Sequence, residues 1–287
     1  MGIVTRTRYV VPLPNRAALV LGERTLVMGI LNVTPDSFSD GGVRLDAARA
    51  IADGLRMIEE GADVVDVGGE STRPGAEPLA VDEELRRVMP GVERLAASGA
   101  LVSVDTYKAV VAREAIAAGA VIVNDVSGLQ FEPELGGVVA DAGVALVLMH
   151  NRGRSRDMYR DAVYADVVGE ISEELRAAIS RATAAGVDRD AIIIDPGIGF
   201  SKQATHSFTA LAHLADFARL DRPILSGPSR KSFLNAALGE RPPAGREWGT
   251  AAAVAASVLF GAHIVRVHRV AEMVDVVRVA DRIRASM

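Results

Sequence analysis

Eight short apolar segments recur along this 287-residue chain, and nearly every one is followed by a stretch with helical spacing. The segments are rich in Val and Ile and are almost continuously apolar, without alternating polar residues. Such segments are typical of parallel strands that are buried on both faces. We therefore expect strands at 26–32, 63–67, 101–104, 121–123, 145–149, 191–194, 223–225 and 263–267.

The intervening stretches carry the signals of helices. Between the first two strands, for example, Ala48, Ile51, Leu55 and Ile58 form an apolar stripe that Gly61 ends. Eight β-α units in a domain of this length favour an α/β fold of the closed (β/α)₈ TIM-barrel type, although an open doubly wound sheet stays possible because counting units cannot show closure. We expect helices near 47–60, 82–98, 108–118, 133–141, 166–185, 205–219, 230–238, 248–260 and 270–285.

The first 24 residues have a different character. Two short β-prone pieces, at 9–11 and 18–21, lie on either side of Pro12 and Pro14, which predicts a peripheral hairpin. No change in composition further along the chain resembles a linker. We therefore expect an N-terminal hairpin extension over 1–24 and a single barrel domain over 25–287.

Composition excludes several classes of function. The net charge of −5 argues against a nucleic-acid surface, and the absence of cysteine excludes thiolate chemistry and a cysteine-ligated zinc site. No secretory signal is recognisable, and the longest run of small apolar residues, Ala251–Ala262, is too short to span a bilayer. We expect a soluble, cytoplasmic protein that binds neither nucleic acid nor membrane. The GPSRKS segment resembles a phosphate-binding loop but lacks the glycine that a Walker A loop has before its lysine, so it is not a Walker A motif.

Polar residues follow the predicted strands at their carboxyl ends. In a barrel these ends converge on one face, where the active site lies. Asp and Asn also end strands simply as turn formers, so any one of them alone has an ordinary structural explanation. The whole set nevertheless predicts one polar pocket: Asn32, Asp66, Asp105, Asn124, His150, Asp195, Ser229, Lys231, Arg266 and His268.

The types of residue in this set indicate the ligand. Strand alternation places Arg266 and His268 on one side, as expected for an anion such as phosphate. Asn32 and Asp36 offer oxygen ligands suited to Mg²⁺. Each also has an ordinary structural explanation, Asn32 as the end of a strand and Asp36 as part of a Pro-Asp turn. Asp105, Asn124 and Asp195 are rich in acceptors, which a flat heterocycle with adjacent amino and ring N–H groups would satisfy.

At this point the sequence resembles the dihydropteroate synthase family, over about Leu26 to Ile283. The order and spacing of several segments carry the resemblance, among them MGILNVTPDSFSDGG, DVGGESTRPGA, DPGIGFSK, GPSRKSF and VRVH. The remaining matching segments are 103–108, 123–128, 148–150 and 249–254. One departure is Arg269, where the family usually has Asp after the final His.

The resemblance implies a (β/α)₈ barrel that joins 6-hydroxymethyl-7,8-dihydropterin pyrophosphate to p-aminobenzoate in folate biosynthesis. Asp105, Asn124, Asp195 and Lys231 would bind the pterin, with Met149 as a pocket wall. Asn32, Arg266 and His268 would hold pyrophosphate, and Asn32 and Asp36 would hold Mg²⁺. Asp36 and Arg73 would arrive when two mobile loops close. The p-aminobenzoate site would comprise Thr72, Pro74, Phe200 and Ser229.

The resemblance also implies a mechanism and an assembly. Substitution at the pterin methylene would be dissociative, with Asp36, Lys231, Arg266 and His268 as the catalytic groups and Mg²⁺ as the cofactor. A homodimer formed through late helices and a sulfonamide target are further expectations. Two alternatives remain. A pterin-binding methyltransferase would not require the SFSDGG loop or the Ser229–Lys231 turn, and the intact Asn32, Lys231, Arg266 and His268 argue against a catalytically silent, pterin-binding paralogue.

Overall fold

The computed structural model describes residues 6–34, 43–73, 75–160 and 162–286. Eight parallel strands lie in the order β8-β7-β6-β5-β4-β3-β10-β9. Ile194 and Ile224 form a parallel bridge between the two ends of this sheet, and Ile194 N–H donates to Pro223 O at 2.9 Å. The sheet is therefore a barrel and not an open sheet. Its strands are β3 (Leu26–Asn32), β4 (Val64–Gly68), β5 (Val102–Asp105), β6 (Ile122–Asp125), β7 (Ala145–Met149), β8 (Ile192–Asp195), β9 (Leu225–Ser226) and β10 (Ile264–Val267).

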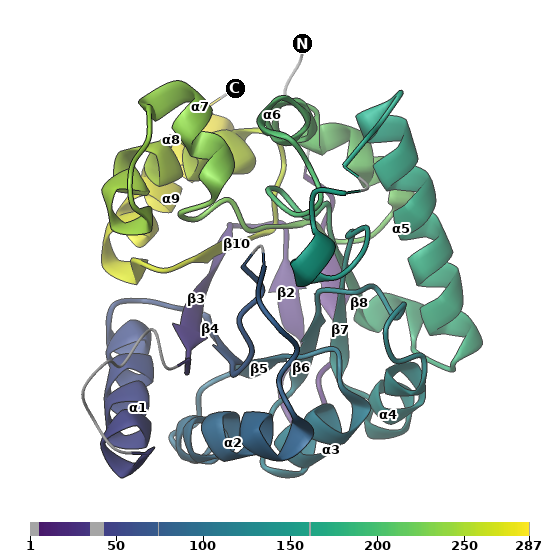
Figure 1. Ribbon diagram of the computed structural model, residues 1–287, viewed down its shortest axis with the longest axis vertical. Helices are drawn as coiled ribbons and strands as arrows, with labels where there is room; N and C mark the ends of the chain where they lie inside the picture. The colour runs from purple at the N-terminus through teal and green to yellow at the C-terminus, as the bar shows by residue number, and fades with distance from the viewer. Residues whose placement is uncertain (1–5, 35–42, 74, 161, 287) are drawn as a thin grey trace.

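Helices surround the barrel on its outside (Figure 1). Most follow the expected bounds because the apolar stripes and helix-ending glycines predict them well; Gly143, for instance, ends one helix in the left-handed conformation at φ +63°. The helices are α1 (Val43–Glu59), α2 (Val81–Ala97), α3 (Ala109–Ala117), α4 (Glu134–Ala142), α5 (Val167–Ala184), α6 (Ala204–Ala212), α7 (Asn235–Leu238), α8 (Glu247–Leu259) and α9 (Val270–Ala285). None in the described part is both long enough and apolar enough to cross a membrane.

The predicted helix over 205–219 is two elements. α6 ends at Ala212, and a 3₁₀ segment, Leu214–Leu220, follows it. The buried residues of this segment are Leu214, Phe217 and Leu220, three residues apart. This spacing matches the three residues per turn of a 3₁₀ helix, so all three side chains face the core. The predicted helix over 230–238 is likewise divided into a 3₁₀ turn, Ser232–Leu234, and α7.

Alternation along the strands separates two layers of the core. One cluster contains Met28, Ile122 and Ile193 and lies inside the barrel, whereas a second contains Val27, Val123 and Ile194 together with helix residues. Polar residues continue the inward parity at the carboxyl ends of the strands. This parity aims the side chains of Asn32, Asp66, Asp105, Asn124, Asp195 and Arg266 toward the barrel axis.

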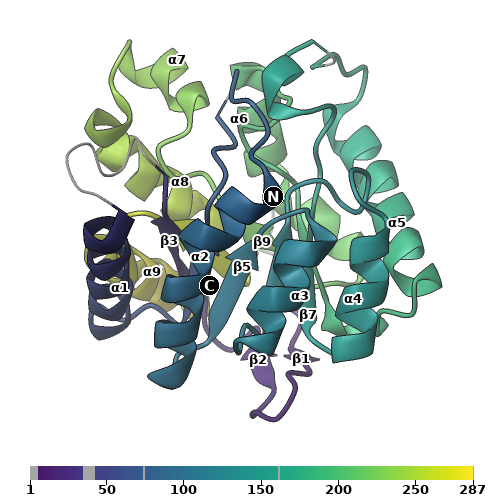
Figure 2. The same ribbon diagram turned by 60° about the horizontal axis from the view of Figure 1, so that its bottom comes forward.

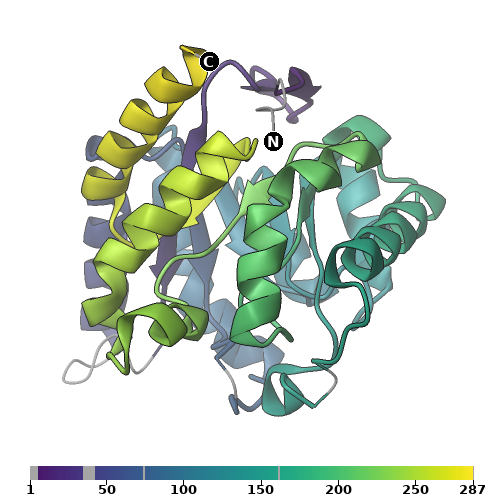
Figure 3. The ribbon, with the colours of Figure 1, turned by 90° about the horizontal axis from the view of Figure 1, so that it is seen from above.

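The N-terminal residues form the expected hairpin, from β1 (Tyr9–Val11) and β2 (Leu19–Leu21). It lies below the barrel, at the end away from α7 (Figure 2). Leu21 is fully buried and belongs to the same apolar cluster as the inward residues at the lower ends of the strands. The C-terminus lies near the hairpin (Figure 3), and Arg6 forms an ion pair with Asp281 of α9 at 3.1 Å. The hairpin therefore closes the end of the barrel opposite the predicted site.

The neutral side chain of His263 connects the backbone just before β9 to the N-terminal segment. Its Nδ1 accepts from Ile224 N–H at 3.1 Å and its Nε2 lies 3.0 Å from Thr7 O, so the proton belongs on Nε2. Burial lowers the pKa of His263 to about 4, below the usual value of about 6.5. Between these values the unfolded chain binds a proton that the folded chain does not. Stability is therefore full above pH 6.5 and falls as the pH falls toward 4.

We expect this group to contribute up to about 3 kcal/mol to the loss of unfolding free energy between pH 6.5 and pH 4. His263→Gln, which keeps one donor and one acceptor but cannot titrate, should flatten the dependence. Urea unfolding at several pH values measures it, with His213→Gln at an exposed position as the matched control. If unfolding free energy depends on pH as steeply in His263→Gln as in the wild type, and less steeply in the control, this assignment is contradicted.

Candidate active site

A cavity of about 470 Å³ opens at the carboxyl end of the barrel. Nine of the predicted site residues line it: Asn32, Thr72, Arg73, Asp105, Phe200, Ser229, Lys231, Arg266 and His268. Asn124, Met149 and Asp195 are buried and adjoin this group through the contacts below. The structure thus brings together residues from strands far apart in the sequence, as the predicted convergence requires. Asp36 and Pro74 lie outside the described residues.

Arg266 forms the floor of the cavity. Its Nε donates to Asp66 Oδ2 and its second guanidinium nitrogen donates to Asp105 Oδ2, each at 2.6 Å. Asn124 also donates to Asp66 Oδ2, at 2.9 Å. Asp66 is completely buried and does not line the cavity. It therefore orients both Arg266 and Asn124 from below, while burial raises the pKa of Asp105 and Arg266 opposes that rise.

Asp195 ends β8 with one oxygen engaged. Gly197 N–H donates to Oδ1 at 2.7 Å, and no hydrogen bond within the described chain uses Oδ2. A methyl group at Gly227, in the cavity wall, would lie 3.9 Å from Oδ2, so this oxygen faces the cavity side. The carboxylate retains acceptor capacity for a ligand.

Lys231 faces the two inward aspartates. Its Nζ lies 3.4 Å from the centre of the Phe200 ring. Burial lowers the pKa of Lys231 to about 7, and the charge of Arg266 acts in the same direction, whereas Asp195 and Asp105 oppose it. Burial raises the pKa of Asp195 to about 6, against the pull of Gly197 N–H, Lys231, Lys202 and Arg266. The cavity therefore combines an ammonium donor and a carboxylate acceptor, both close to changing charge at neutral pH.

The side of the cavity around His268 is electropositive. Burial lowers the pKa of His268 to about 3, and the cations Arg230, Arg266, Lys231 and Arg73 act in the same direction. Ser229 Oγ lies 2.9 Å from His268 Nδ1 and accepts from the His268 backbone N–H at 3.2 Å. A neutral imidazole close to three arginines, which stay charged, suits an anion. Ser229 thus lies beside His268, and its assignment to p-aminobenzoate stays a prediction.

An apolar wall stands opposite. Met149 and Phe200 pack with Tyr107, Val126 and Met158 in a small buried cluster. Phe200 and Met158 of this cluster line the cavity and give it an apolar side next to Lys231. The arrangement suits an aromatic ligand that needs polar contacts only along its edges.

The sequence interpretation missed a cluster that holds the base of the 70–79 loop. Glu70 accepts from Tyr107 O–H at 3.0 Å, from Lys108 Nζ at 2.5 Å and from Leu79 N–H at 3.0 Å. Lys108 also pairs with Glu84, which is fully buried on α2. Glu70 therefore ties both ends of the loop that carries Thr72 and Arg73. Its position inside the ESTR segment was the one available signal.

His150 does not belong to the pocket, contrary to the expectation from strand ends. It follows Met149, whose side chain faces inward, so alternation turns His150 outward. There its Nδ1 lies 2.8 Å from Lys202 Nζ. Arg152 lies close to the same group, where it binds Glu170 at 2.7 Å and stacks on Tyr164 at 4.0 Å.

Arg269 does not disturb the site. Its side chain is about half exposed and donates to Glu272 Oε1 at 2.8 Å on the surface of α9. His268 takes its contact from Ser229 instead. The departure from the usual Asp is therefore absorbed outside the cavity.

Asn32 is the described residue that could hold a metal ion. Within the described residues no group of three or more His, Asp or Glu side chains is placed to bind one. Mg²⁺ usually keeps several waters and takes only one or two protein ligands besides substrate phosphate oxygens. Asn32 in the cavity wall, close to the cations, fits that mode.

Comparisons with known proteins agree with this site. The family described as "Pterin binding enzyme" matches residues 28–268. A dihydropteroate synthase of Synechocystis is 45% identical over 94% of this chain and 94% of its own length. A Xanthomonas albilineans dihydropteroate synthase solved with 4-aminobenzoic acid has a TM-score of 0.90 and 45% identity, covering 97% of this chain and 99% of that one. A Yersinia pestis dihydropteroate synthase solved with a sulfonamide drug has a TM-score of 0.89 and 40% identity, covering 96% and 99%.

These similarities extend over nearly the full length of each chain. They include the strand ends and loops that build the cavity, because the match to the family begins in β3 and ends at His268. The chain therefore belongs to the pterin-binding enzyme family and, within it, to the dihydropteroate synthases, transferases of pterinylmethyl groups in folate synthesis.

Proposed function

We propose that this chain condenses 6-hydroxymethyl-7,8-dihydropterin pyrophosphate with p-aminobenzoate, giving 7,8-dihydropteroate and pyrophosphate. The observation that carries the proposal is the division of one cavity into three chemically distinct sides. At the floor, Asp105 and the adjoining Asp195 offer acceptors beside Arg266, a cationic side surrounds His268, and an apolar wall contains Phe200. The three sides match a heterocycle, a diphosphate and an aromatic amine.

The pterin occupies the floor in this proposal. Asp195 Oδ2 accepts from the amino group and the neighbouring ring N–H, and Asn124 adds a polar contact at the same depth. Lys231 donates to the ring carbonyl, where a carboxylate could not serve. The Arg266 guanidinium, fixed by Asp66 and Asp105, lies against the ring and reaches toward the phosphates.

The remaining two sides of the cavity take the pyrophosphate group of the first substrate and the second substrate, p-aminobenzoate. Pyrophosphate lies near Asn32, Arg73 and His268, where positive charge collects. The ring of p-aminobenzoate lies between the 70–79 loop, with Thr72 and Pro74, and Phe200. Ser229, which lies beside His268 on the cationic side, completes the proposed p-aminobenzoate site. Sulfonamides, which mimic p-aminobenzoate, are expected to compete for this side.

The reaction proceeds by dissociative substitution at the pterin methylene. Arg266 and the neighbouring cations stabilise the departing pyrophosphate, since charge develops on its bridging oxygen. The electron-rich pterin delocalises the resulting cation, and the proposed role of the Asp36 carboxylate is to help stabilise it. The amine of p-aminobenzoate then attacks the methylene directly and releases a proton to solvent. No covalent bond to the protein forms at any step.

Mg²⁺ is the proposed cofactor, and Asn32 and Asp36 would hold it. When bound, it would supply charge stabilisation to the leaving pyrophosphate. The support is the hard oxygen donor at Asn32 in the cavity wall.

The deciding experiment measures pyrophosphate release from the pterin pyrophosphate with and without p-aminobenzoate and Mg²⁺. We expect release of stoichiometric 7,8-dihydropteroate only when both are present, and loss of activity on chelation that added Mg²⁺ restores. A methyltransferase or a silent paralogue would bind pterin without forming a product that depends on p-aminobenzoate. That outcome would overturn the proposed reaction.

A homodimer in the cytoplasm completes the proposal. Trp248, near the start of α8, is 85% exposed, which is unusual for a side chain of this size. A contact between late helices of two chains would cover it. Sedimentation of the wild type and of Trp248→Ala tests this: a monomeric wild type would contradict it.

A further inference from the structure

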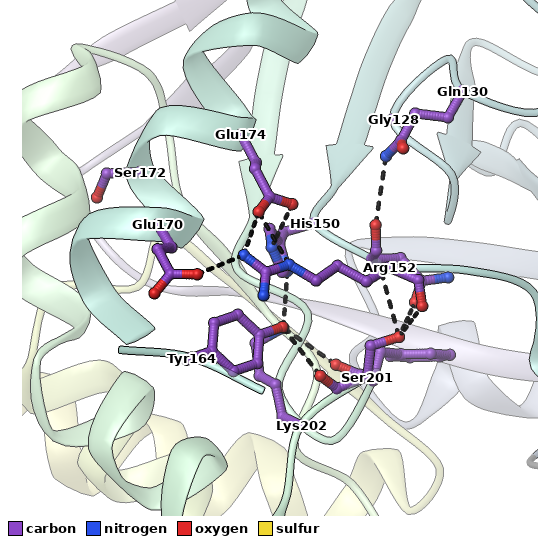
Figure 4. Close-up of polar contacts among 12 residues, drawn as sticks. Gly128, Gln130, His150, Arg152, Tyr164, Glu170, Ser172, Glu174, Ser201 and Lys202 are labelled. Atoms are coloured by element: carbon purple, nitrogen blue, oxygen red, sulfur yellow. Dashed lines mark hydrogen bonds and ion pairs between the residues drawn. The ribbon is translucent and has the colours of Figure 1, made fainter. Parts of the chain in front are cut away.

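Lys202 is buried behind the wall of the cavity, and the proposed reaction does not use it. It is 2% exposed, does not line the cavity, and is among the largest buried side chains of the described residues. Its Nζ lies 2.8 Å from His150 Nδ1 (Figure 4). The same Nζ donates to Phe200 O at 3.1 Å. A buried ammonium is costly unless it has partners, and an apolar side chain would fill the same space.

We propose that Lys202, held from behind by His150 and Glu174, is a positioning residue that fixes the Asp195–Phe200 segment in its substrate-binding conformation. The inference rests on the proposed function, because Asp195 and Phe200 are the pterin and p-aminobenzoate contacts there. It assigns the role to a residue that touches neither substrate.

The segment that Lys202 holds has an unusual backbone. Gly197 and Gly199 have φ of +67° and +80°, and Ser201, which is not glycine, has φ of +46°. A methyl group at Gly197 would lie 2.1 Å from His150 O and 3.4 Å from Lys202 Nζ. Backbone of this kind persists where its surroundings determine it. The contacts of Lys202 with Phe200 O and of the His150 N–H with Asp195 O, at 2.8 Å, brace both ends of the turn.

His150 connects this segment to α5. Burial lowers the pKa of His150 to about 4, so its Nδ1 accepts from the ammonium and its Nε2 carries the proton, 3.1 Å from Glu174 Oε2. Glu174 also accepts from Arg152 Nε at 2.9 Å. Figure 4 shows Lys202, His150, Glu174 and Arg152 as one connected group. The ammonium therefore has a fixed location set by a helix outside the barrel.

The charge of Lys202 also reaches Asp195. Lys231 and Arg266 face Asp195 from the cavity, while Lys202 acts from the opposite side, and all three favour its ionised form. Lys202 in turn is near Asp195, Glu174, Arg152 and Lys231, and burial lowers its pKa to about 7. Losing this cation should make Asp195 harder to ionise and should free the Phe200 carbonyl.

The sequence makes Lys202 unusually easy to observe. The chain has only three lysines, Lys108, Lys202 and Lys231, against 29 arginines. Protein labelled with ¹³Cε-lysine therefore gives three NMR signals, and Lys202→Met identifies one of them. We expect the Lys202 signal to titrate well below the usual lysine value of about 10.4 and to shift when 6-hydroxymethyl-7,8-dihydropterin is added.

Lys202→Met is expected to keep its fold and to lower kcat/KM by about 10- to 100-fold, with KM raised for both substrates. The acidic limb of pterin binding should move to higher pH by about one unit. Glu174→Gln should shift both quantities in the same direction but less. Glu173→Gln, an exposed carboxylate one residue away on α5, is the matched control and should resemble wild type.

A lower melting temperature in Lys202→Met with unchanged KM values and an unchanged acidic limb would overturn the proposal and leave Lys202 a stability residue. If Lys202→Met does not fold, a Glu174→Gln variant that matches Glu173→Gln in its KM values and in its acidic limb would overturn the proposal equally. Direct pterin binding needs no turnover. A wild type without p-aminobenzoate-dependent product therefore contradicts the proposed reaction, not the role of Lys202 in pterin binding.

Discussion

Asp195→Ala is expected to weaken the binding of 6-hydroxymethyl-7,8-dihydropterin by at least about 100-fold. Two charge-assisted hydrogen bonds to the ligand would be lost, each worth about 1.5–3 kcal/mol, and the ring N–H and amino group would be buried without acceptors. Isothermal titration calorimetry measures the affinity, and circular dichroism confirms the fold. The effect is expected to be the largest of any single substitution, because Asp195 Oδ2 faces the cavity without a partner among the described residues.

The pH dependence of pterin affinity provides a second, independent test of the role of Asp195. The pKa of Asp195 is raised to about 6 by burial, so the carboxylate that the ligand requires is lost as the pH falls through 6. Wild-type affinity should therefore fall below this pH. Asp141→Ala, at an exposed position on α4, is the matched control and should bind as wild type does. Equal pterin affinity in Asp195→Ala and wild type would refute the pocket assignment.

Lys231→Met is expected to have the second largest effect, a loss of about 10- to 100-fold in pterin affinity and a larger loss in kcat/KM. The substitution removes one charged donor, worth about 1.5–3 kcal/mol. Methionine has a similar length and keeps an apolar contact with the Phe200 ring, so packing changes little. Removing the ammonium also takes away a charge that favours ionised Asp105 and Asp195.

Calorimetry and steady-state kinetics on the same preparation separate these contributions. The acidic limb of pterin binding should move to higher pH in Lys231→Met, since both aspartates then ionise less readily. Arg241→Met removes an exposed cation from the nearby segment before α8 and should leave both quantities unchanged. A Lys231→Met variant with wild-type pterin affinity would show that the ammonium makes no contact with the ring carbonyl.

Local pattern was sufficient for most of the fold. The strands β3 and β7 have the predicted bounds, and the other strands differ by one or two residues at their ends. Val- and Ile-rich segments between helix-ending glycines specify such units because burial on both faces leaves few alternatives. The 214–220 segment was mistaken for part of a helix because an apolar period of three differs little from 3.6 over seven residues.

The candidate site divides in the same way. Asp105, Asn124, Asp195 and Arg266 could be predicted because each lies at or next to the carboxyl end of a strand with inward parity. His150 could not be separated from them, since one residue of register decides whether a side chain faces the barrel axis or the helices. Glu70 and Asp66 act through partners 38 and 200 residues away, and no local pattern signals such contacts.

The sequence by itself determined the order of the elements and the polar residues that end the strands, because hydrophobic spacing and turn chemistry are local properties. Only the tertiary structure decided that a single bridge, Ile194 to Ile224, joins the ends of the sheet, that Arg266 lies between Asp66 and Asp105, and that Lys202 supports the cavity wall from behind. These depend on distances between residues that are far apart in the chain. Such distances are fixed by closure of the barrel and by the packing of α5 against it.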